Sequence, residues 1–394
     1  MTNPLLKLGD QGQSVWLDYL HLKILQDGTL GRLIEMDEIR GLTSNPSIFE
    51  KAIGGGDDYD VRLKAVLDAG DADIMRLYEH LAIGDIQTAA DEFRPVYERL
   101  NGQDGYVSLE VSPYLAMDTS ATIAEARRLW RAVDRPNLMI KIPGTKAGVP
   151  AIRELIGEGI NVNVTLLFAI DAYLDVAEAY LVGLEVLKGS GGDISRTHSV
   201  ASFFLSRIDV AIDQAITERS KGGARDELEA LRGHAAIASA KIAYQNFLAL
   251  LDTPRWKALA SAGAAPQRLL WASTSTKDPS YSDVRYVAEI IGRDTINTMP
   301  PKTMDAFRDH GKVRESLTEN IGQARQVLAS IEGLGLDLDQ VTDELVQEGV
   351  RQFAQSFDGL LGAVANKRAA ILGAKLDRQT IDASQRSIAH TRIY

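Results

Sequence analysis

The strongest constraint on the fold is an alternation of short strand-like segments with longer helical segments through the first three quarters of the chain. The helical segments include Thr119–Val133, Ile170–Leu187 and Ser206–Thr217. Strands that alternate with helices form right-handed βαβ units around a parallel sheet. The predicted strands are residues 14–19, 39–44, 106–112, 138–142, 160–166, 199–204, 268–274 and 295–298. About eight such units in roughly 300 residues match a closed barrel better than an open doubly wound sheet. We therefore predict the α/β class and a (β/α)8 barrel, or TIM barrel.

Further helices are expected outside this repeat. The connections over 46–104 and 208–266 are too long for one crossover and are predicted to hold inserted helices. After Gly311 the strand pattern stops, and residues 339–372 carry apolar side chains at helical spacing. Ser316 and Glu319 have the spacing of a capping box, which predicts the start of a helix there. The expected domains are a catalytic barrel over 1–310 and a C-terminal helical extension over 311–394, packed on the barrel.

Two aromatic residues of this extension, Phe353 and Phe357, are separated by one helical turn. That spacing indicates the buried stripe of a helix. The alternative, in which the extension reaches over the mouth of the barrel, stays open.

Composition narrows the class of protein and of partner. The chain has 43 Lys and Arg against 54 Asp and Glu, a net charge of −11 at pH 7, and no cysteine. The lack of cysteine excludes disulfides, thiolate nucleophiles and iron–sulfur clusters. An acidic chain without a basic run is a poor candidate for binding nucleic acid or an anionic membrane. The histidines are scattered, with no pair at i, i+4 spacing, so no metal site is predicted.

No segment has the character of a membrane span or a secretory signal. The most apolar stretch, Val162–Leu187, is interrupted by acidic residues. The first residues lack the basic-then-apolar order of a signal peptide. We expect a cytoplasmic protein, and the sequence does not distinguish a monomer from a homodimer.

Several predicted strands are apolar on one face and polar on the other. Because side chains alternate along a strand, the apolar face of a barrel strand meets the helices and the polar face points inward. In residues 138–142, for example, Leu138, Ile140 and Ile142 lie opposite Lys141. Active sites of such barrels lie at the carboxyl ends of the strands. The polar residues predicted to converge there are Asp18, Asn45, Glu110, Lys141, Asn163 and Thr165.

Lys141 is the most informative of these residues. It lies between Ile140 and Ile142, and a lysine is almost never fully buried without a partner. One interpretation is a structural salt bridge to Glu110 or Asp18. The other, which we favour, is an amine that is neutral often enough to attack a carbonyl.

An interior lysine with two nearby carboxylates suits Schiff-base chemistry on a ketone. The amine condenses with the carbonyl, and the protonated imine then withdraws electrons from a neighbouring carbon–carbon bond as that bond breaks. Carboxylates are needed to move protons to and from the substrate hydroxyl and the carbinolamine. Asn45 and Asn163 can bind substrate hydroxyls without adding charge.

At these residues the sequence resembles the transaldolase family, in its longer bacterial form. The segments that carry the resemblance are SVWLDYL, IRGLTSNPSIFEKAI, VSLEVSPYLA, LMIKIPGTKAG, INVNVTLLF, SFFLSRID and LLWASTSTK, in that order. The resemblance implies a transferase of the non-oxidative pentose phosphate pathway. Such an enzyme moves a dihydroxyacetone unit from sedoheptulose 7-phosphate or fructose 6-phosphate to an aldose phosphate, with no metal or organic cofactor.

The resemblance also implies a role for each site residue. Lys141 forms the Schiff base, Asp18 takes the proton from the hydroxyl at the bond that is cleaved, and Glu110 acts through a water held by Thr165. Asn45 and Asn163 position the substrate. The phosphate is bound by Ser202 and Arg207.

One segment departs from the family pattern. Shorter family members have an arginine after the seventh strand for phosphate, whereas this chain has Ser275 near that position and Lys277 two residues later. Ser275 and Lys277 are therefore the candidates for the second phosphate ligand. The expected partners are sugar phosphates.

Two other functions are considered. A related aldolase would release its three-carbon product instead of transferring it, but the fructose-6-phosphate aldolases have a tyrosine at the position of Phe204 and an uncharged residue at that of Glu110. A non-catalytic sugar-phosphate-binding protein would have no use for a desolvated amine at Lys141.

Overall fold

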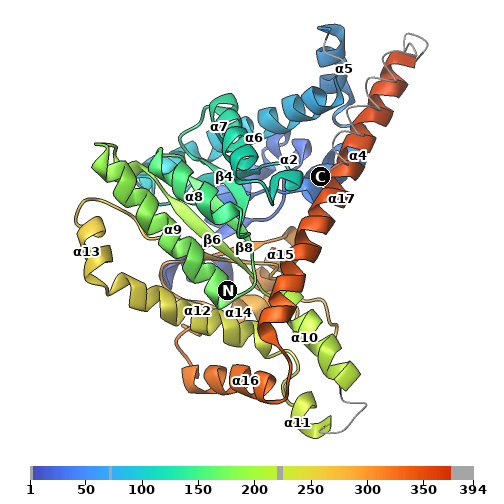
Figure 1. The fold of residues 1–394 in the computed structure, drawn as a ribbon. Helices are drawn as coiled ribbons and strands as arrows, with labels where there is room; N and C mark the ends of the chain where they lie inside the picture. The colour runs from blue at the N-terminus through green and yellow to red at the C-terminus, as the bar shows by residue number, and fades with distance from the viewer. Residues whose placement is uncertain (1–2, 71–72, 220–224, 374–394) are drawn as a thin grey trace.

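The computed structural model describes residues 3–70, 73–219 and 225–373. Its centre is a closed barrel of parallel strands in sequence order, in which β1 pairs with both β2 and β8. Figure 1 shows the helices that surround these strands. The strands are β1 Gln13–Leu17, β2 Gly41–Thr43, β3 Tyr106–Glu110, β4 Leu138–Pro143, β5 Val162–Leu167, β6 Ser199–Phe204, β7 Arg268–Ala272 and β8 Thr295–Met299. The predicted (β/α)8 barrel is confirmed, and each predicted strand overlaps an observed one.

Helices surround this barrel. Those that follow the strands are α7 Thr119–Val133, α8 Gly148–Gly157, α9 Ile170–Gly189, α10 Ser206–Arg219, α14 Arg285–Ala288 and α15 Pro301–His310. The two long connections hold inserted helices, as expected: α4 Pro46–Gly54, α5 Asp60–Asp68 and α6 Ile74–Arg99 in one, and α11 Arg225–Glu229, α12 Ala235–Leu251 and α13 Pro254–Ala260 in the other. The remaining elements are α1 Pro4–Asp10, α2 Leu22–Gln26, α3 Thr29–Met36, η1 Pro113–Leu115, η2 Ile194–Arg196, α16 Ile321–Gly333 and α17 Leu338–Leu372.

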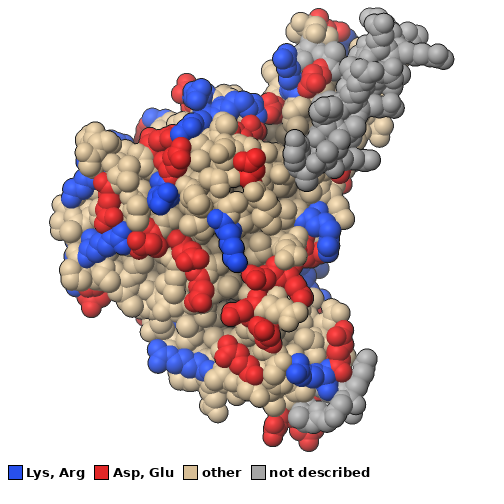
Figure 2. Space-filling model, in the orientation of Figure 1, with Lys and Arg blue, Asp and Glu red and all other residues tan. Residues whose placement is uncertain are grey.

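The surface carries both signs of charge. On the face shown in Figure 2, basic and acidic side chains are interspersed. None of the helices in the described part of the chain has an apolar stretch of the length needed to cross a bilayer.

The amino-terminal end of the barrel interior is closed by a buried polar network. Asp104 accepts hydrogen bonds from Ser14 Oγ and from Trp16 Nε1, at 2.5 and 2.8 Å, and pairs with Arg268 at 3.2 Å. The Trp16 indole fills the space beside β2, where a Cβ added to Gly41 would lie 2.4 Å from the ring. These contacts fill the barrel below the polar carboxyl-terminal end.

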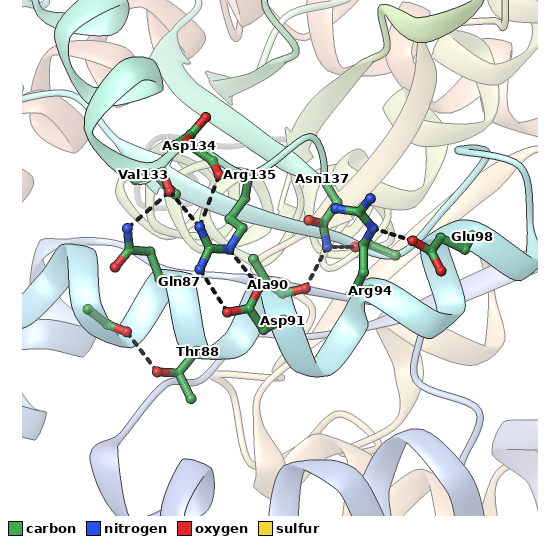
Figure 3. Close-up of polar contacts among 12 residues, drawn as sticks. Gln87, Thr88, Ala90, Asp91, Arg94, Glu98, Val133, Asp134, Arg135 and Asn137 are labelled. Carbon is green, nitrogen blue, oxygen red and sulfur yellow. Dashed lines mark hydrogen bonds and ion pairs between the residues drawn. The ribbon is translucent and has the colours of Figure 1, made fainter.

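Hydrogen bonds to α6 and to the residue before β3 fix the start of β4, the strand that carries Lys141. Asn137 Nδ2 donates to the carbonyls of Ala90 and Gly105 at 2.9 and 2.8 Å, and Arg135 pairs with Asp91 (Figure 3). Because Asn137 directly precedes β4 and is fully buried, these bonds set where the strand begins.

The extension differs from the expectation at one helix start. The capping box predicted at Ser316 and Glu319 is wrong, since α16 begins at Ile321 without a side-chain cap. The Ser316 hydroxyl instead accepts a hydrogen bond from the backbone N–H of Ile291 at 2.9 Å. The long helix α17 runs along one side of the molecule and packs on α4, α6 and α10 (Figure 1).

Candidate active site

The carboxyl ends of the strands surround a cavity of about 560 Å³. A cavity of this size accommodates a small polar substrate. Of the residues predicted from the sequence, those that line it are Asp18, Asn45, Lys141, Ser202, Arg207, Ser275 and Lys277. Glu110, Asn163 and Thr165 do not line it and are buried behind these residues.

Lys141 lies on the inner face of β4 and is 4% exposed. Its Nζ is 3.2 Å from Glu110 Oε2 and donates to the backbone carbonyl of Ser44, also at 3.2 Å. The strand register sets the first contact, because Glu110 of β3 is the direct partner of Lys141. The salt bridge between Lys141 and Glu110, one of the two interpretations of the sequence, is therefore present. It also places an acid beside the amine.

Both carboxyl groups near the amine are shifted toward their protonated form. Burial raises the pKa of Glu110, and the nearby Lys141 lowers it to a smaller extent. Burial also raises the pKa of Asp18, against the opposing effects of Lys141 and of a hydrogen bond from Thr43. A buried carboxyl group with a raised pKa can accept a proton and return it during a reaction.

The Asp18 carboxylate is oriented by hydroxyl groups on the neighbouring strands. Thr43 Oγ1 donates to Asp18 Oδ1 at 2.8 Å and also lies 2.8 Å from Thr298 Oγ1. Asp18 directly follows β1, and its backbone N–H bonds to the carbonyl of Met299. The acid is thus fixed at the rim of the closed barrel.

The amide side chains differ in how far their hydrogen bonds are already satisfied. Asn45 caps α4 through its Oδ1, which accepts a hydrogen bond from the backbone N–H of Ile48 at 3.0 Å. The amide nitrogen of Asn45 takes no part in this cap. Asn163 donates to Ser108 Oγ and accepts from Ser202 Oγ, at 3.0 and 2.7 Å.

Thr165 is placed to hold a small polar group. Its Oγ1 is buried and has no hydrogen-bond partner among the described residues. Buried hydroxyls are normally paired, so this oxygen has capacity for a water or a substrate atom.

Three cations gather at the other side of the cavity. Arg207 Nη1 is buried without a hydrogen-bond partner among the described residues. Burial lowers the pKa of Lys277, and the charges of Arg207 and Lys51 lower it further. Lys277 Nζ donates to Ser275 Oγ at 3.0 Å. Like charges placed this close repel one another, and an anionic ligand bound between them would relieve that repulsion.

Comparisons with known proteins identify the family of this chain. The family described as Transaldolase/Fructose-6-phosphate aldolase matches residues 15–364. The chain belongs to this family. The transaldolase of Trichodesmium erythraeum is 48% identical over 373 residues, which cover 93% of this chain and 98% of that protein. The transaldolase of Thiobacillus denitrificans is 49% identical over 353 residues, covering 90% of this chain and 97% of that protein.

Lys51 and Phe353 also line the cavity of this transaldolase-family protein. The sequence did not single out Lys51. For Phe353 it left open that the extension reaches over the mouth of the barrel, and Phe353 does line the cavity. Lys51 lies on α4 three residues after Ile48, so both face the cavity from one side of the helix. The i, i+3 spacing of Ile48 and Lys51, on the helix that Asn45 caps, is a signal that could have identified Lys51. Phe353 lines the cavity from α17, and no local signal distinguishes it from a core residue. Among the described residues there is no group of three His, Asp or Glu side chains arranged for a metal ion.

Proposed function

We propose that this chain is a transaldolase that transfers a dihydroxyacetone unit between sugar phosphates through a Schiff base on Lys141. The observation that carries the proposal is the position of the Lys141 amine. It is shielded from bulk solvent, lies 3.2 Å from the Glu110 carboxyl group, and belongs to a residue that lines the same cavity as Asp18. Family membership supports the class of reaction. We further propose the cytoplasm as its location, residues 1–310 as the catalytic domain and 311–394 as an extension, of which 374–394 lie outside the described residues.

The first step forms the Schiff base. The Lys141 amine attacks the carbonyl carbon of the ketose phosphate, and the carbonyl oxygen takes one proton from the attacking nitrogen. To leave as water, the oxygen must gain a second proton from an acid. Glu110 supplies that proton through a water held by Thr165, whose hydroxyl has free hydrogen-bonding capacity. The raised pKa of Glu110 makes its protonated form available for this step.

The second step breaks the carbon–carbon bond. Asp18 removes the proton from the hydroxyl next to the bond, a carbonyl forms there, and the bond electrons pass to the protonated imine. The aldose phosphate leaves and an enamine remains on Lys141. A second aldose phosphate then accepts the three-carbon unit by the same steps in reverse.

The remaining polar residues bind and orient the substrate. Arg207 is the principal phosphate ligand, with Lys277, Lys51 and Ser275 beside it. The amide nitrogen of Asn45, which takes no part in capping α4, binds a substrate hydroxyl. Asn163 orients Ser202, which lines the cavity on the side of Arg207.

The proposal is tested by trapping the intermediate. The protein is incubated with fructose 6-phosphate and borohydride, its mass is measured, and turnover is assayed with and without erythrose 4-phosphate. A dihydroxyacetone adduct on Lys141 and turnover that depends on the acceptor are expected. Release of free dihydroxyacetone at a comparable rate without acceptor would instead identify an aldolase. The absence of an adduct would identify a non-catalytic binding protein.

A substitution tests the nucleophile itself. Lys141→Ala is expected to abolish turnover and trapping while circular dichroism remains that of the folded protein, because the change removes the amine alone. Retained turnover would show that another residue is the nucleophile.

A further inference from the structure

Helix α17 contributes a side chain to the cavity that none of the steps above uses. Phe353, midway along α17, is 6% exposed and lines the cavity with Asp18, Lys141 and Arg207. The centre of its ring is 5.7 Å from Lys141 Nζ. We propose that Phe353 shields the Lys141 intermediate from water and so determines whether the bound three-carbon unit is transferred or hydrolysed. This inference rests on the proposed function.

Lys141 Nζ has two polar contacts and also lies near the ring of Phe353. Glu110 and the carbonyl of Ser44 each lie 3.2 Å from Nζ. An aromatic face within about 6 Å of a cation stabilises that cation. The protonated imine is such a cation, and the ring favours it while occupying space that water would otherwise enter.

The position of Phe353 is fixed by its neighbours on the same face of α17. One turn before it, Gly349 packs so closely on Leu166 of β5 that an added Cβ would lie 2.8 Å from Leu166 Cδ2. One turn after it, Phe357 packs edge-on against Tyr78, with ring centres 5.5 Å apart. The ring is therefore held by packing along the helix.

The shield acts on the enamine that remains after the first aldose phosphate leaves. In transfer, the enamine carbon attacks the acceptor carbonyl and a new carbon–carbon bond forms. In hydrolysis, the enamine carbon takes a proton instead, water adds to the resulting imine carbon, and the carbon–nitrogen bond breaks to give dihydroxyacetone and the free amine. Proton delivery from water to the enamine carbon decides between these outcomes, and the ring limits the approach of water.

The test is the ratio of two rates from one enzyme sample. Dihydroxyacetone release from fructose 6-phosphate alone is divided by transfer to erythrose 4-phosphate, so the ratio does not depend on how much protein is folded. Phe353→Ala is expected to raise this ratio at least about fivefold, the scale of one lost aromatic contact. Phe353→Leu, which refills most of the volume, is expected to restore much of the wild-type ratio.

A further variant separates shielding from general loosening of α17. Leu360 is fully buried on the same helix and does not line the cavity, so Leu360→Ala should lower stability without changing the ratio.

An unchanged ratio in Phe353→Ala, or an equal rise in Leu360→Ala, would overturn the shield. Borohydride trapping separates this failure from that of the proposed function. If wild-type protein forms the Lys141 adduct and the ratio is unchanged, only the shield is wrong. If no adduct forms, the proposed function itself is wrong.

Discussion

At the scale of single residues, the chemistry depends on a few groups taken out of water. Lys141 lies close enough to Glu110 and Asp18 to lower the pKa of both carboxyl groups, but burial is the larger influence and raises both pKa values. A protein interior stabilises such charges poorly unless they are paired. The cost of burying them is typical of sites that carry function.

Asp18→Asn tests the proposed base. Turnover is expected to fall by about 10²–10⁴-fold, the usual contribution of a general base. Because the folded-state pKa of Asp18 is raised, the stability that this group contributes at low pH is lost as the pH rises from the ordinary value of 3.8 through the folded-state pKa. The variant cannot ionise, so it should unfold at a higher urea concentration at pH 7. Steady-state rates and urea titrations at pH 7 check both effects. A variant that is equally active, or that is less stable than wild type, would contradict this account of Asp18.

Arg207→Gln tests the phosphate ligand. The Michaelis constant for fructose 6-phosphate should rise at least about tenfold with a smaller change in kcat, since a charged hydrogen bond to phosphate is lost. Lys51→Met and Lys277→Met are matched controls from the same cation group and should have smaller effects. A Michaelis constant near wild type in Arg207→Gln would mean that the phosphate is bound elsewhere.

At the scale of elements, the start of β6 contains a group that links stability to pH. His198 precedes β6, bonds to the carbonyl of Ser195 at 3.2 Å and packs against Tyr106. Burial lowers the pKa of His198 to about 4, from an ordinary value of 6.5. The ring is therefore held neutral inside the barrel wall.

This shift predicts the direction of acid sensitivity. The unfolded chain binds a proton at His198 below pH 6.5 and the folded chain does not until about pH 4, so stability is lost as the pH falls through this window. The loss amounts to about 2–3 kcal/mol between pH 7 and pH 4.5. His198→Phe should remove this part of the pH dependence, as measured by urea unfolding at the two pH values. An unchanged difference between pH 7 and pH 4.5 would show that His198 is not the group responsible.

At the scale of the whole molecule, the two ends of the barrel have separate tasks. The carboxyl end holds the cavity, and the amino end is closed by the network of Asp104 with Ser14, Trp16 and Arg268. This network joins β1, β7 and the segment before β3. Because it lies away from the cavity, stability and catalysis can be changed independently.

Arg268→Met should destabilise the fold by about 2–4 kcal/mol, because it leaves the buried Asp104 carboxylate without its cationic partner. Turnover of the remaining folded protein should stay near wild type. Arg255→Met is the control, since Arg255 pairs with Glu178 and Glu185 at the surface and its loss should cost less than about 1 kcal/mol. Equal effects of the two variants on urea unfolding would argue against a stabilising role of the network.

Much of this protein is determined by its sequence alone. The period-two alternation in strands such as β4 places Lys141 on the inner face, because a one-residue slip would put Ile140 and Ile142 inside instead. The alternation of strands with helices predicted the barrel, and the period-two pattern predicted the convergence of the polar residues that line the cavity or lie directly behind it. Hydrophobic periodicity is a local property, so it can be recognised without knowing the neighbours of a strand.

Only the tertiary structure decided the contacts between distant segments. Ser316 had the local pattern of a helix cap, but its hydroxyl bonds to Ile291 instead. Phe353 had the pattern of a core residue, and the packing of α17 across the end of β5 brings it to Lys141. The partner of a side chain depends on which surfaces come into contact when the chain folds. A local sequence pattern does not show which distant residue that partner will be.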